Sequence, residues 1–377
     1  MTATPSAVRP PPWYARPAAR QWACAAAPEH VLTFHAGLPD YRMTPLVELP
    51  VLADELGVGR TFVKDESCRL GLPAFKALGA SWAVARVLAA RAGLTGPLTL
   101  DAVKAAAAAH PATLVTATDG NHGRAVARMA ALLGLPAQVF VPEVIAPGAA
   151  AAIAAEGATT TTVAGSYDDA VSQACRFAAG QPHAELVQDT AWPGYEEIPS
   201  RIVEGYATLL LEVDAQLHDA DVTRPDLVVV PIGVGSLAQA VVTHYRSRGV
   251  DRPAAVLGVE PDTAACVLHS LIAGELRSVT TGATIMAGLN CGTPSSLGWP
   301  YLRAGLDAAV AVTDDAAARA VTDLGQLGLS SGPSGAAALA GARAVLTGPS
   351  SEGRRAELDV GAESVVVLLS TEGRADH

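Results

Sequence analysis

The sequence predicts an α/β protein with two open, twisted and mostly parallel sheets that carry helices on both faces. From about residue 112 onward, strand-like runs rich in β-branched residues alternate with helix-like runs, as in βαβ units. The chain has 377 residues and half of them are apolar, which is enough for a core divided between two lobes. We expect a smaller lobe, residues 85–189, inserted into a larger lobe formed by residues 1–84 and 190–377.

The individual elements follow from short-range patterns. Strands are predicted where short apolar runs occur, at residues 112–118, 137–142, 159–165, 226–233, 254–261 and 364–370. After the first of these strands, Val126, Met129 and Leu133 recur at helical spacing and predict an amphipathic helix. Further helices are predicted at 148–158 and 166–180, and an alanine-rich helix stops before a proline at 111.

Composition limits the class of function and the location. The first twenty residues are rich in proline and are expected to form a flexible, loosely attached arm. They lack the apolar core of a signal peptide, and no uncharged apolar run reaches about 18 residues, so no membrane span is expected. The net charge of −11, without a basic run, argues against nucleic acid or an anionic membrane as partner. The cytoplasm is the expected location.

The five cysteines are expected to be free thiols. Cys24, Cys68, Cys175, Cys266 and Cys291 are widely spaced and form no C-x-x-C pair. Their spacing therefore implies neither a zinc site nor a disulfide framework. Cys266 and Cys291 could still meet in space.

The turn after the strand at 112–118 is the first candidate site, because ligands of open parallel sheets bind at the carboxyl ends of strands. Gly120 and Gly123 allow a ligand to approach the backbone, and the helix that follows points free N–H groups at the turn. Such a helix start suits a carboxylate or a phosphate, and Asn121 and His122 add polar side chains. The alternative is an ordinary glycine-rich connection in which Asp119 caps the helix.

A second unusual turn contains Gly233, Val234, Gly235, Ser236 and Leu237, between a strand and a helix. It begins like a dinucleotide-binding fingerprint, but it lacks the third glycine and the acidic residue about twenty positions later. It also lacks the lysine of a P-loop. A short nest of N–H groups remains, which suits one phosphate rather than a pyrophosphate.

A lysine at the start of a long helix is the third candidate. The chain has three lysines, Lys64, Lys76 and Lys104. Lys104 lies in the alanine-rich helix, and Lys64 lies at the end of a predicted strand. Lys76 lies just before a helix, whereas the helix dipole favours a lysine at the other end. It is therefore the best candidate to bond a carbonyl cofactor. The alternative for Lys76 is a plain surface lysine. One phosphate nest, one anion-binding turn and one such lysine together indicate pyridoxal 5'-phosphate and an amino acid substrate.

The residues also resemble a known family, over almost the whole chain. The matching motifs are "FHAGLPDYRMTPL", "KDESCRLGLPAFKALGAS", "TATDGNHG", "QDTAWPGYEEIP", "GVGS", "TIMAGLNCGTPS" and "LLSTEG". They resemble the fold-type II (tryptophan-synthase β-like) pyridoxal phosphate enzymes, most closely the diaminopropionate ammonia-lyases. This resemblance implies the fold-type II architecture, a homodimer and a lyase activity.

The resemblance also implies roles in cofactor binding. Lys76 would form the imine with the cofactor, Phe75 would pack beside its ring, and Asn121 would bond the ring hydroxyl. The turn at 233–237 would hold the phosphate. A neutral hydroxyl from Ser370, or from its neighbour Thr371, would bond the pyridine nitrogen, a setting that suits β-elimination.

Two acids, Asp119 and Asp189, are implied as catalytic residues that flank the substrate Cα. A carboxylate can pair with the second amine of the substrate, or act as a base toward Cα–H. Together with Gly120 and His122 they form the expected substrate site. The expected reaction is α,β-elimination of ammonia from D- or L-2,3-diaminopropionate, which gives pyruvate and ammonia. For Asp189 the cap of a following turn or helix is the alternative.

Several positions depart from the family pattern. Pro73 replaces a usual asparagine, Pro193 an acid and Thr293 a glutamate, while Pro333 lies in a loop expected over the cofactor. After Gly373 the usual acidic residue is missing. Because the rim of the expected site loses negative charge, elimination or replacement on another β-substituted alanine is an alternative activity. A protein that binds the cofactor without turnover is a further alternative.

Overall fold

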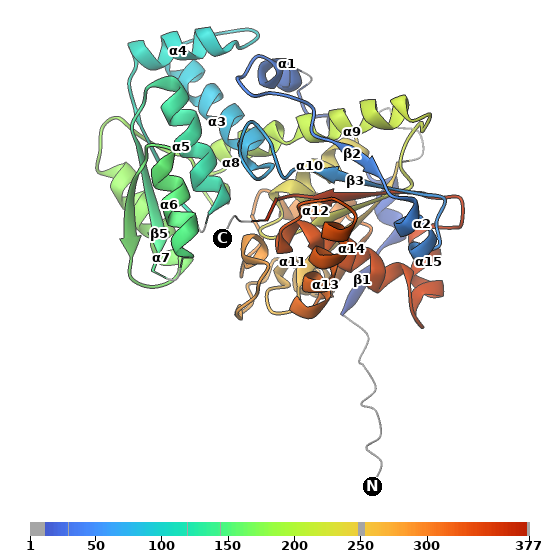
Figure 1. Cartoon of the computed structure of the whole chain (residues 1–377). Helices are drawn as coiled ribbons and strands as arrows, with labels where there is room; N and C mark the ends of the chain where they lie inside the picture. The colour runs from blue at the N-terminus through green and yellow to red at the C-terminus, as the bar shows by residue number, and fades with distance from the viewer. Residues whose placement is uncertain (1–11, 29, 119, 144, 248–252, 375–377) are drawn as a thin grey trace.

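The structure is a computed structural model and describes residues 12–28, 30–118, 120–143, 145–247 and 253–374. Figure 1 shows a group of strands and helices drawn in green beside a larger group that contains both the blue and the red ends of the chain. Each group is built on its own sheet, and helices cover the sheets. The predicted α/β class with two mostly parallel sheets is confirmed.

The larger sheet has seven strands in the order β1-β10-β9-β8-β11-β3-β2. The five inner strands pair in parallel, and the two outermost strands, β1 and β2, pair antiparallel to their neighbours. The strands are β1 (Trp13–Ala15), β2 (Leu46–Glu48), β3 (Arg60–Asp65), β8 (Leu227–Pro231), β9 (Ala255–Pro261), β10 (Ala308–Val312) and β11 (Val365–Ser370). Because β3 and β11 are neighbours, the beginning and the end of the chain share this sheet.

The smaller sheet has four parallel strands in the order β6-β5-β4-β7. They are β4 (Thr113–Ala117), β5 (Ala137–Pro142), β6 (Thr159–Val163) and β7 (Ala184–Leu186). All four lie between residues 85 and 189. The domain boundaries placed at these two positions stay a prediction.

Helices connect the strands on both sides of each sheet (Figure 1). They are α1 (His30–Ala36), α2 (Pro50–Leu56), α3 (Lys76–Arg91), α4 (Leu100–Ala109), α5 (Asn121–Leu133), α6 (Pro147–Ala155), α7 (Tyr167–Ala179), α8 (Glu197–Gly205), α9 (Ala207–Asp219), α10 (Ser236–Tyr245), α11 (Cys266–Ala273), α12 (Trp299–Gly305), α13 (Asp314–Gln326), α14 (Pro333–Leu346) and α15 (Ser351–Leu358), with two short 3₁₀ helices, η1 (Pro17–Gln21) and η2 (Ala287–Leu289). Val126, Met129 and Leu133 are all buried on α5, as their spacing predicts. Among the described residues, no helix combines the length and the apolar character needed to cross a bilayer.

The expectation of a loose N-terminal arm is wrong for residues 12–20. Trp13 pairs with Val310 as β1 joins the edge of the larger sheet, and Ala19 is fully buried. Arg20 forms an ion pair with Asp307 at 3.0 Å. The prolines do not prevent this packing, because one of them occupies the first position of η1, where no helical N–H is needed. Residues 1–11 lie outside the described part of the chain.

Helix α3, which begins at Lys76, is held by a close contact with α8. A Cβ on Gly79 would lie 2.6 Å from the ring of Tyr206, and a Cβ on Gly205 would lie 2.6 Å from the carbonyl oxygen of Leu78. Neither position has room for a side chain, so the two helix backbones approach each other closely. This contact fixes the first turns of α3 against the larger lobe.

Candidate active site

The candidate residues lie where strands of both sheets end. Lys76 follows β3, the turn at 118–121 follows β4, and Asp189 lies beyond the end of β7. The loop at 233–237 follows β8, and Ser370 is the last residue of β11. Because all these strands run in parallel within their sheets, their carboxyl ends gather the turns that the sequence singled out.

Lys76 and Asp189 form an ion pair, with Nζ 2.5 Å from Oδ2. Their side chains are 21% and 9% exposed, so the pair is largely shielded from water. Burial alone would raise the pKa of Asp189, but the charge of Lys76 and the hydrogen bond from Lys76 outweigh it. The pKa of Asp189 therefore lies well below its usual range, and the carboxylate stays ionised.

His122 lies near the same carboxylate oxygen of Asp189. Its Nε2 donates a hydrogen bond to the carbonyl oxygen of Val187 at 2.8 Å, so the proton of the neutral ring sits on Nε2. Burial lowers the pKa of His122, with a further contribution from the charge of Lys76 and an opposing one from Asp189. Its Nδ1 lies 3.9 Å from Asp189 Oδ2 and has no hydrogen-bond partner in the part of the chain that the structure describes.

The turn before α5 contains two helix N–H groups that no described residue accepts. The Thr118 hydroxyl oxygen accepts the N–H groups of Gly120 and Gly123, at 3.0 and 3.1 Å. The N–H groups of Asn121 and His122 have no acceptor within the described ranges, so a carboxylate seat and a helix cap by Asp119 both stay predictions. Asp119 lies outside the described residues, so its role stays a prediction.

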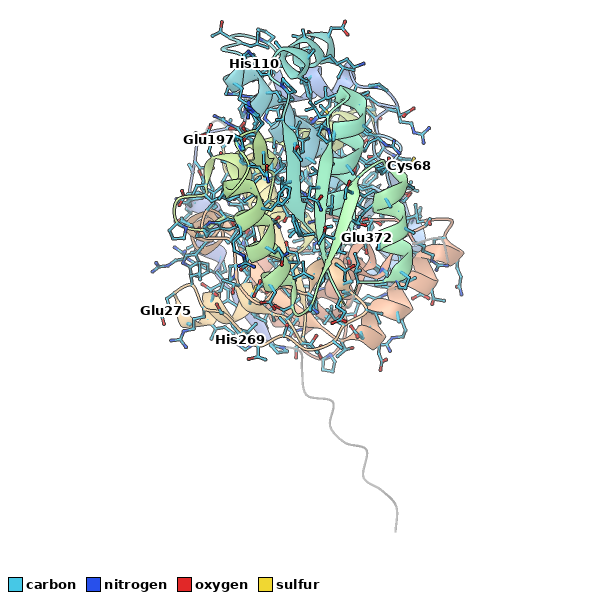
Figure 2. The ribbon with its side chains drawn as sticks, turned by 90° about the vertical axis from the view of Figure 1, so that its left-hand side faces the viewer. Cys68, His110, Glu197, His269, Glu275 and Glu372 are labelled. Atoms are coloured by element: carbon cyan, nitrogen blue, oxygen red, sulfur yellow. The ribbon has the colours of Figure 1, made fainter. Side chains whose placement is uncertain are left out.

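Glu372 is a site residue that sequence reasoning missed. Its Oε2 accepts a hydrogen bond from Asn121 Nδ2 at 2.8 Å, and its Oε1 accepts the N–H of Ser334 at 3.1 Å (Figure 2 labels Glu372). One carboxylate thus joins the start of α5 to the start of α14. An acid directly after the two hydroxyl residues that end a strand is the signal that could have identified it.

The loop at 233–237 has the features of a phosphate nest. Its five backbone N–H groups have no acceptor among the described residues, and the N-terminal end of α10 contributes its partial positive charge. Gly235 has a φ of +100°, and a Cβ there would lie 2.7 Å from Leu302 Cδ1. The Ser236 hydroxyl donates to the carbonyl oxygen of Asp189 at 3.0 Å, which ties the nest to the ion pair.

Two hydroxyl residues and an aromatic ring complete the set of predicted cofactor residues. The hydroxyl of Ser370 donates to the hydroxyl of Ser331 at 2.8 Å, and both are buried. The carbonyl oxygen of Thr371 accepts the N–H of Phe75 at 3.2 Å. The ring of Phe75 lies 4.8 Å from the ring of Tyr206, between the lysine and the contact of α3 with α8.

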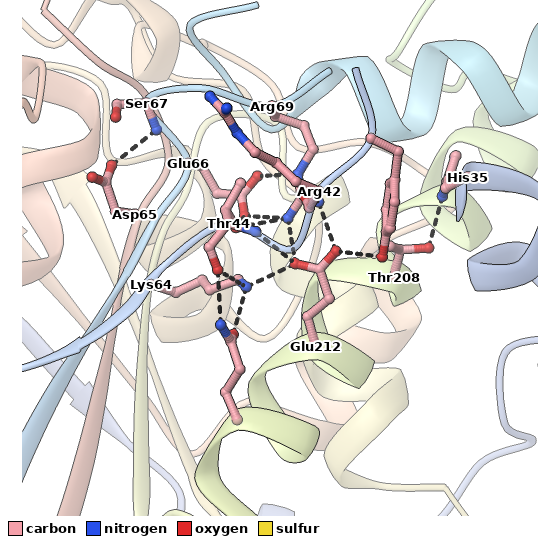
Figure 3. A network of polar contacts seen from close by, with 12 residues as sticks. His35, Arg42, Thr44, Lys64, Asp65, Glu66, Ser67, Arg69, Thr208 and Glu212 are labelled. Carbon is pink, nitrogen blue, oxygen red and sulfur yellow. Dashed lines mark hydrogen bonds and ion pairs between the residues drawn. The ribbon is translucent and has the colours of Figure 1, made fainter. Parts of the chain in front are cut away.

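Lys64 is committed to a buried network of charges and cannot compete with Lys76 for a cofactor (Figure 3). It is fully buried, and its Nζ donates to Glu212 at 2.7 Å and to Gln216 at 2.8 Å. Arg69 pairs with the same Glu212 at 2.7 Å. Lys104 is exposed on α4.

The thiols and two of the departures from the family pattern are resolved by the structure. All five cysteines are free, as predicted. Pro333 occupies the first position of α14, where a fixed φ and a missing N–H favour the helix. Thr293 exchanges a hydrogen bond of 2.8 Å with the hydroxyl of Ser278, so a polar contact remains where a glutamate was expected.

The residues present suit pyridoxal phosphate. The N–H nest at 233–237 suits its phosphate, Lys76 supplies an amine, and the hydroxyls of Ser370 and Thr371 lie at the end of the neighbouring strand. Buried polar atoms without partners among the described residues point the same way. Four of the seven such atoms belong to segments next to these residues, namely His122 Nδ1, Thr190 Oγ1, Gln239 Oε1 and Asn290 Oδ1, and the other three lie elsewhere in the fold.

Comparisons with known proteins support the cofactor and the family. The family model described as "Pyridoxal-phosphate dependent enzyme" matches residues 38–370. A diaminopropionate ammonia-lyase of Salmonella typhimurium is 37% identical, with 91% of this chain and 88% of the relative covered. The diaminopropionate ammonia-lyase of Escherichia coli in complex with D-serine is 36% identical, with a TM-score of 0.84 over 92% of this chain and 89% of that one. The same E. coli protein with an aminoacrylate-PLP azomethine reaction intermediate is 33% identical, with a TM-score of 0.82 over 97% and 94%.

Proposed function

The chain belongs to the pyridoxal-phosphate dependent enzymes, among the relatives of diaminopropionate ammonia-lyase, and we propose from this that it eliminates ammonia from 2,3-diaminopropionate. The observation that carries the proposal is the Lys76–Asp189 ion pair beside the N–H nest at 233–237. The substrate loses one ammonia by elimination, and the 2-aminoacrylate released takes up water to give pyruvate and a second ammonia. D and L enantiomers are both candidate substrates.

The cofactor residues are proposed as follows. Lys76 binds the aldehyde carbon, the nest at 233–237 binds the phosphate, and Asn121 faces the ring hydroxyl. Ser370 or Thr371 serves the ring nitrogen. When bound, pyridoxal phosphate withdraws the negative charge that develops at the substrate Cα. Support for Asn121 comes from its hydrogen bond to Glu372, which orients the amide and leaves its oxygen available to the site.

Lys76 and Asp189 are proposed to divide the proton handling. Because its pKa is held far below neutral, Asp189 is a weak base and keeps its negative charge. Asp189 therefore pairs with a cation, either Lys76 Nζ or an amine of the substrate. The proton donor beside Asp189 is Lys76 Nζ, and it is proposed to transfer its proton to the leaving amine of the substrate.

The substrate carboxylate is proposed to bind at the start of α5. The N–H groups of Asn121 and His122, which have no acceptor among the described residues, support this position, and the neutral His122 ring adds no negative charge. Asp119, in the same turn, is proposed to face the second amine of the substrate. A carboxylate there distinguishes a diamine from serine or threonine, whose β-substituent carries no charge.

An assay of pyruvate release tests the proposal. Purified holoenzyme is given D- or L-2,3-diaminopropionate, serine and threonine in parallel, and pyruvate is measured with lactate dehydrogenase. We expect release from at least one diaminopropionate enantiomer, and little release from serine and threonine. Activity on serine or threonine alone would contradict the substrate assignment, and the alternative β-substituted alanines would then be screened.

The two acids are tested separately. Asp119→Asn and Asp189→Asn are assayed on each enantiomer, with Asp54→Asn, an exposed acid on α2, as the control. We expect both active-site variants to lose activity and Asp54→Asn to keep it. If neither variant changes kcat or KM on either enantiomer, the assignment of the acids is wrong.

A homodimer is also proposed, since the family resemblance implies it, and the cytoplasm is proposed as the location from the composition of the chain. Light scattering after size-exclusion chromatography measures the mass in solution. A mass of one chain at micromolar concentration would contradict the dimer.

A further inference from the structure

A cavity of about 100 Å³ lies between α3, α5 and the loops around residues 38–40 and 70–72. Its walls are mostly apolar and include Leu70, Leu72, Met129 and Leu132. Neither Lys76 nor any other residue placed in the active site above lines it. The space is close to that of a small aliphatic side chain, and so it suits a small ligand rather than a cofactor.

Two opposite charges converge on the mouth of this cavity. Asp40 and Arg128 both line it. A methyl group on Gly71 would lie 3.1 Å from Arg128 Nη1 and 3.5 Å from Asp40 Oδ2, so the cation and the anion face one spot. They form no ion pair with each other within the described part of the chain, although the charge of Asp40, after that of Glu156, contributes to the raised pKa of Arg128.

The arginine is held in place by another residue, which leaves one of its nitrogens toward the cavity. Nε and Nη2 of Arg128 bind both carboxylate oxygens of Glu156. Nη1 donates to no acceptor among the described residues, and the Asp40 carboxylate likewise accepts no hydrogen bond there. A guanidinium anchored in this way is a preorganised seat for a carboxylate.

The backbone at the mouth is unusual as well. Four non-glycine residues in the described ranges have a positive φ, and two of them, Asp40 at +60° and Leu70 at +52°, line this cavity. A bulky residue such as leucine rarely adopts this conformation, and such strain is concentrated at ligand sites. The cavity, the two charges and the strain come from separate observations.

We infer that this cavity is an accessory binding site for a small aliphatic α-amino acid, distinct from the active site. The carboxylate of the ligand binds Arg128 Nη1, its ammonium binds Asp40, and its side chain enters the apolar space. A zwitterion fits because it places opposite charges on neighbouring atoms, as the two protein groups do. Ala77, the next residue after Lys76, is part of the wall, so the ligand would contact the first turn of α3.

Calorimetric titration of the holoenzyme with N,N-dimethyl-L-alanine tests the inference. This probe is a zwitterion, but its tertiary amine cannot form an imine with an aldehyde, so it cannot bind covalently in the active site, and the Asp40 and Ala125 variants separate binding in the cavity from binding at the start of α5. We expect one binding event on the wild-type protein. Asp40→Asn should weaken it by about tenfold or more, because a charge-assisted contact is lost while asparagine keeps the backbone conformation. Isobutyrate, which has the carboxylate but no ammonium, should bind the wild type about tenfold more weakly.

Two further variants make the test specific to this cavity. Ala125→Leu fills the cavity from α5 and should abolish binding. Asp54→Asn removes an equally exposed carboxylate from α2 and should leave binding unchanged. The inference is overturned if the wild type releases no heat, if Asp40→Asn binds as tightly as the wild type, or if isobutyrate binds as well as the zwitterion. Should Ala125→Leu fail to fold, the Asp40 variant and the isobutyrate titration still decide.

Discussion

Removing the charge of Glu212 should destabilise the protein more than removing any surface carboxylate. Glu212 is buried and accepts hydrogen bonds of 2.7 Å from Lys64 and from both terminal nitrogens of Arg69 (Figure 3). Glu212→Gln keeps the shape but leaves these two buried cations facing one carboxylate, that of Glu66. Breaking a buried charge pair in this way costs about 3 to 5 kcal/mol, since the remaining charge is uncompensated.

Urea unfolding followed by circular dichroism measures this loss. With a slope of about 3 kcal/mol per molar urea, the midpoint should fall by about 1 to 2 M. Glu48→Gln, which removes the partner of Arg60 in a half-exposed ion pair, should cost less than about 1 kcal/mol. The double variant Lys64→Met/Glu212→Gln balances the charges again and should recover part of the loss. Equal midpoints for Glu48→Gln and Glu212→Gln would refute the reasoning.

Three further predictions concern the lysine, the nest and the response to pH. Lys76→Ala should abolish both the visible absorbance of the lysine-bound cofactor and the release of pyruvate. If the variant keeps the absorbance, another lysine binds the cofactor. Gly235→Ala should weaken cofactor binding by at least about tenfold in a fluorescence titration, whereas Gly348→Ala, at a similar φ of +83° but in open space, should not. Burial lowers the pKa of His35 to about 3, and the charge of a nearby arginine lowers it further. The unfolded chain therefore binds a proton at this histidine near pH 6.5, whereas the folded protein does not. The contribution of neutral His35 to stability is therefore fully present above pH 6.5 and is lost as the pH falls toward 3. The free energy of unfolding should drop by about 2 kcal/mol from pH 7 to pH 5. His35→Gln should flatten this dependence, and the same change at His110, an exposed residue, should leave it as in the wild type.

Local periodicity predicted most of the architecture. β5 and β11 were predicted within a residue of their ends because apolar, β-branched runs bounded by turn residues leave little choice. β10 was not predicted, because its alanine-rich sequence carries no β-branched signal apart from two valines. β1 was not predicted either, because prolines surround it in the sequence. It is a strand only because it pairs with β10, almost three hundred residues later in the chain.

Candidate site residues could be predicted where neighbouring residues in the sequence mark them. Residues that depend on tertiary contacts could not be predicted. Lys76 was singled out by its place at a helix start, and the nest at 233–237 by its glycines. The partner of Lys64, Glu212, lies 148 residues away in sequence, so no spacing rule could pair them. Glu372 had no assigned role for the same reason, since Asn121, which it orients, lies 251 residues away at the start of α5.

The three-residue strands β1 and β2 have a consequence for handling the protein. They close both margins of the larger sheet, and each is too short to offer another chain a long row of free N–H and C=O groups. Deleting residues 12–21 would uncover the edge of β10, a fully buried, apolar strand, at the residues that β1 pairs, Ala308 to Val310. The shortened protein would be active at first and would then aggregate through the exposed edge of β10. Aggregation would be faster at higher protein concentration.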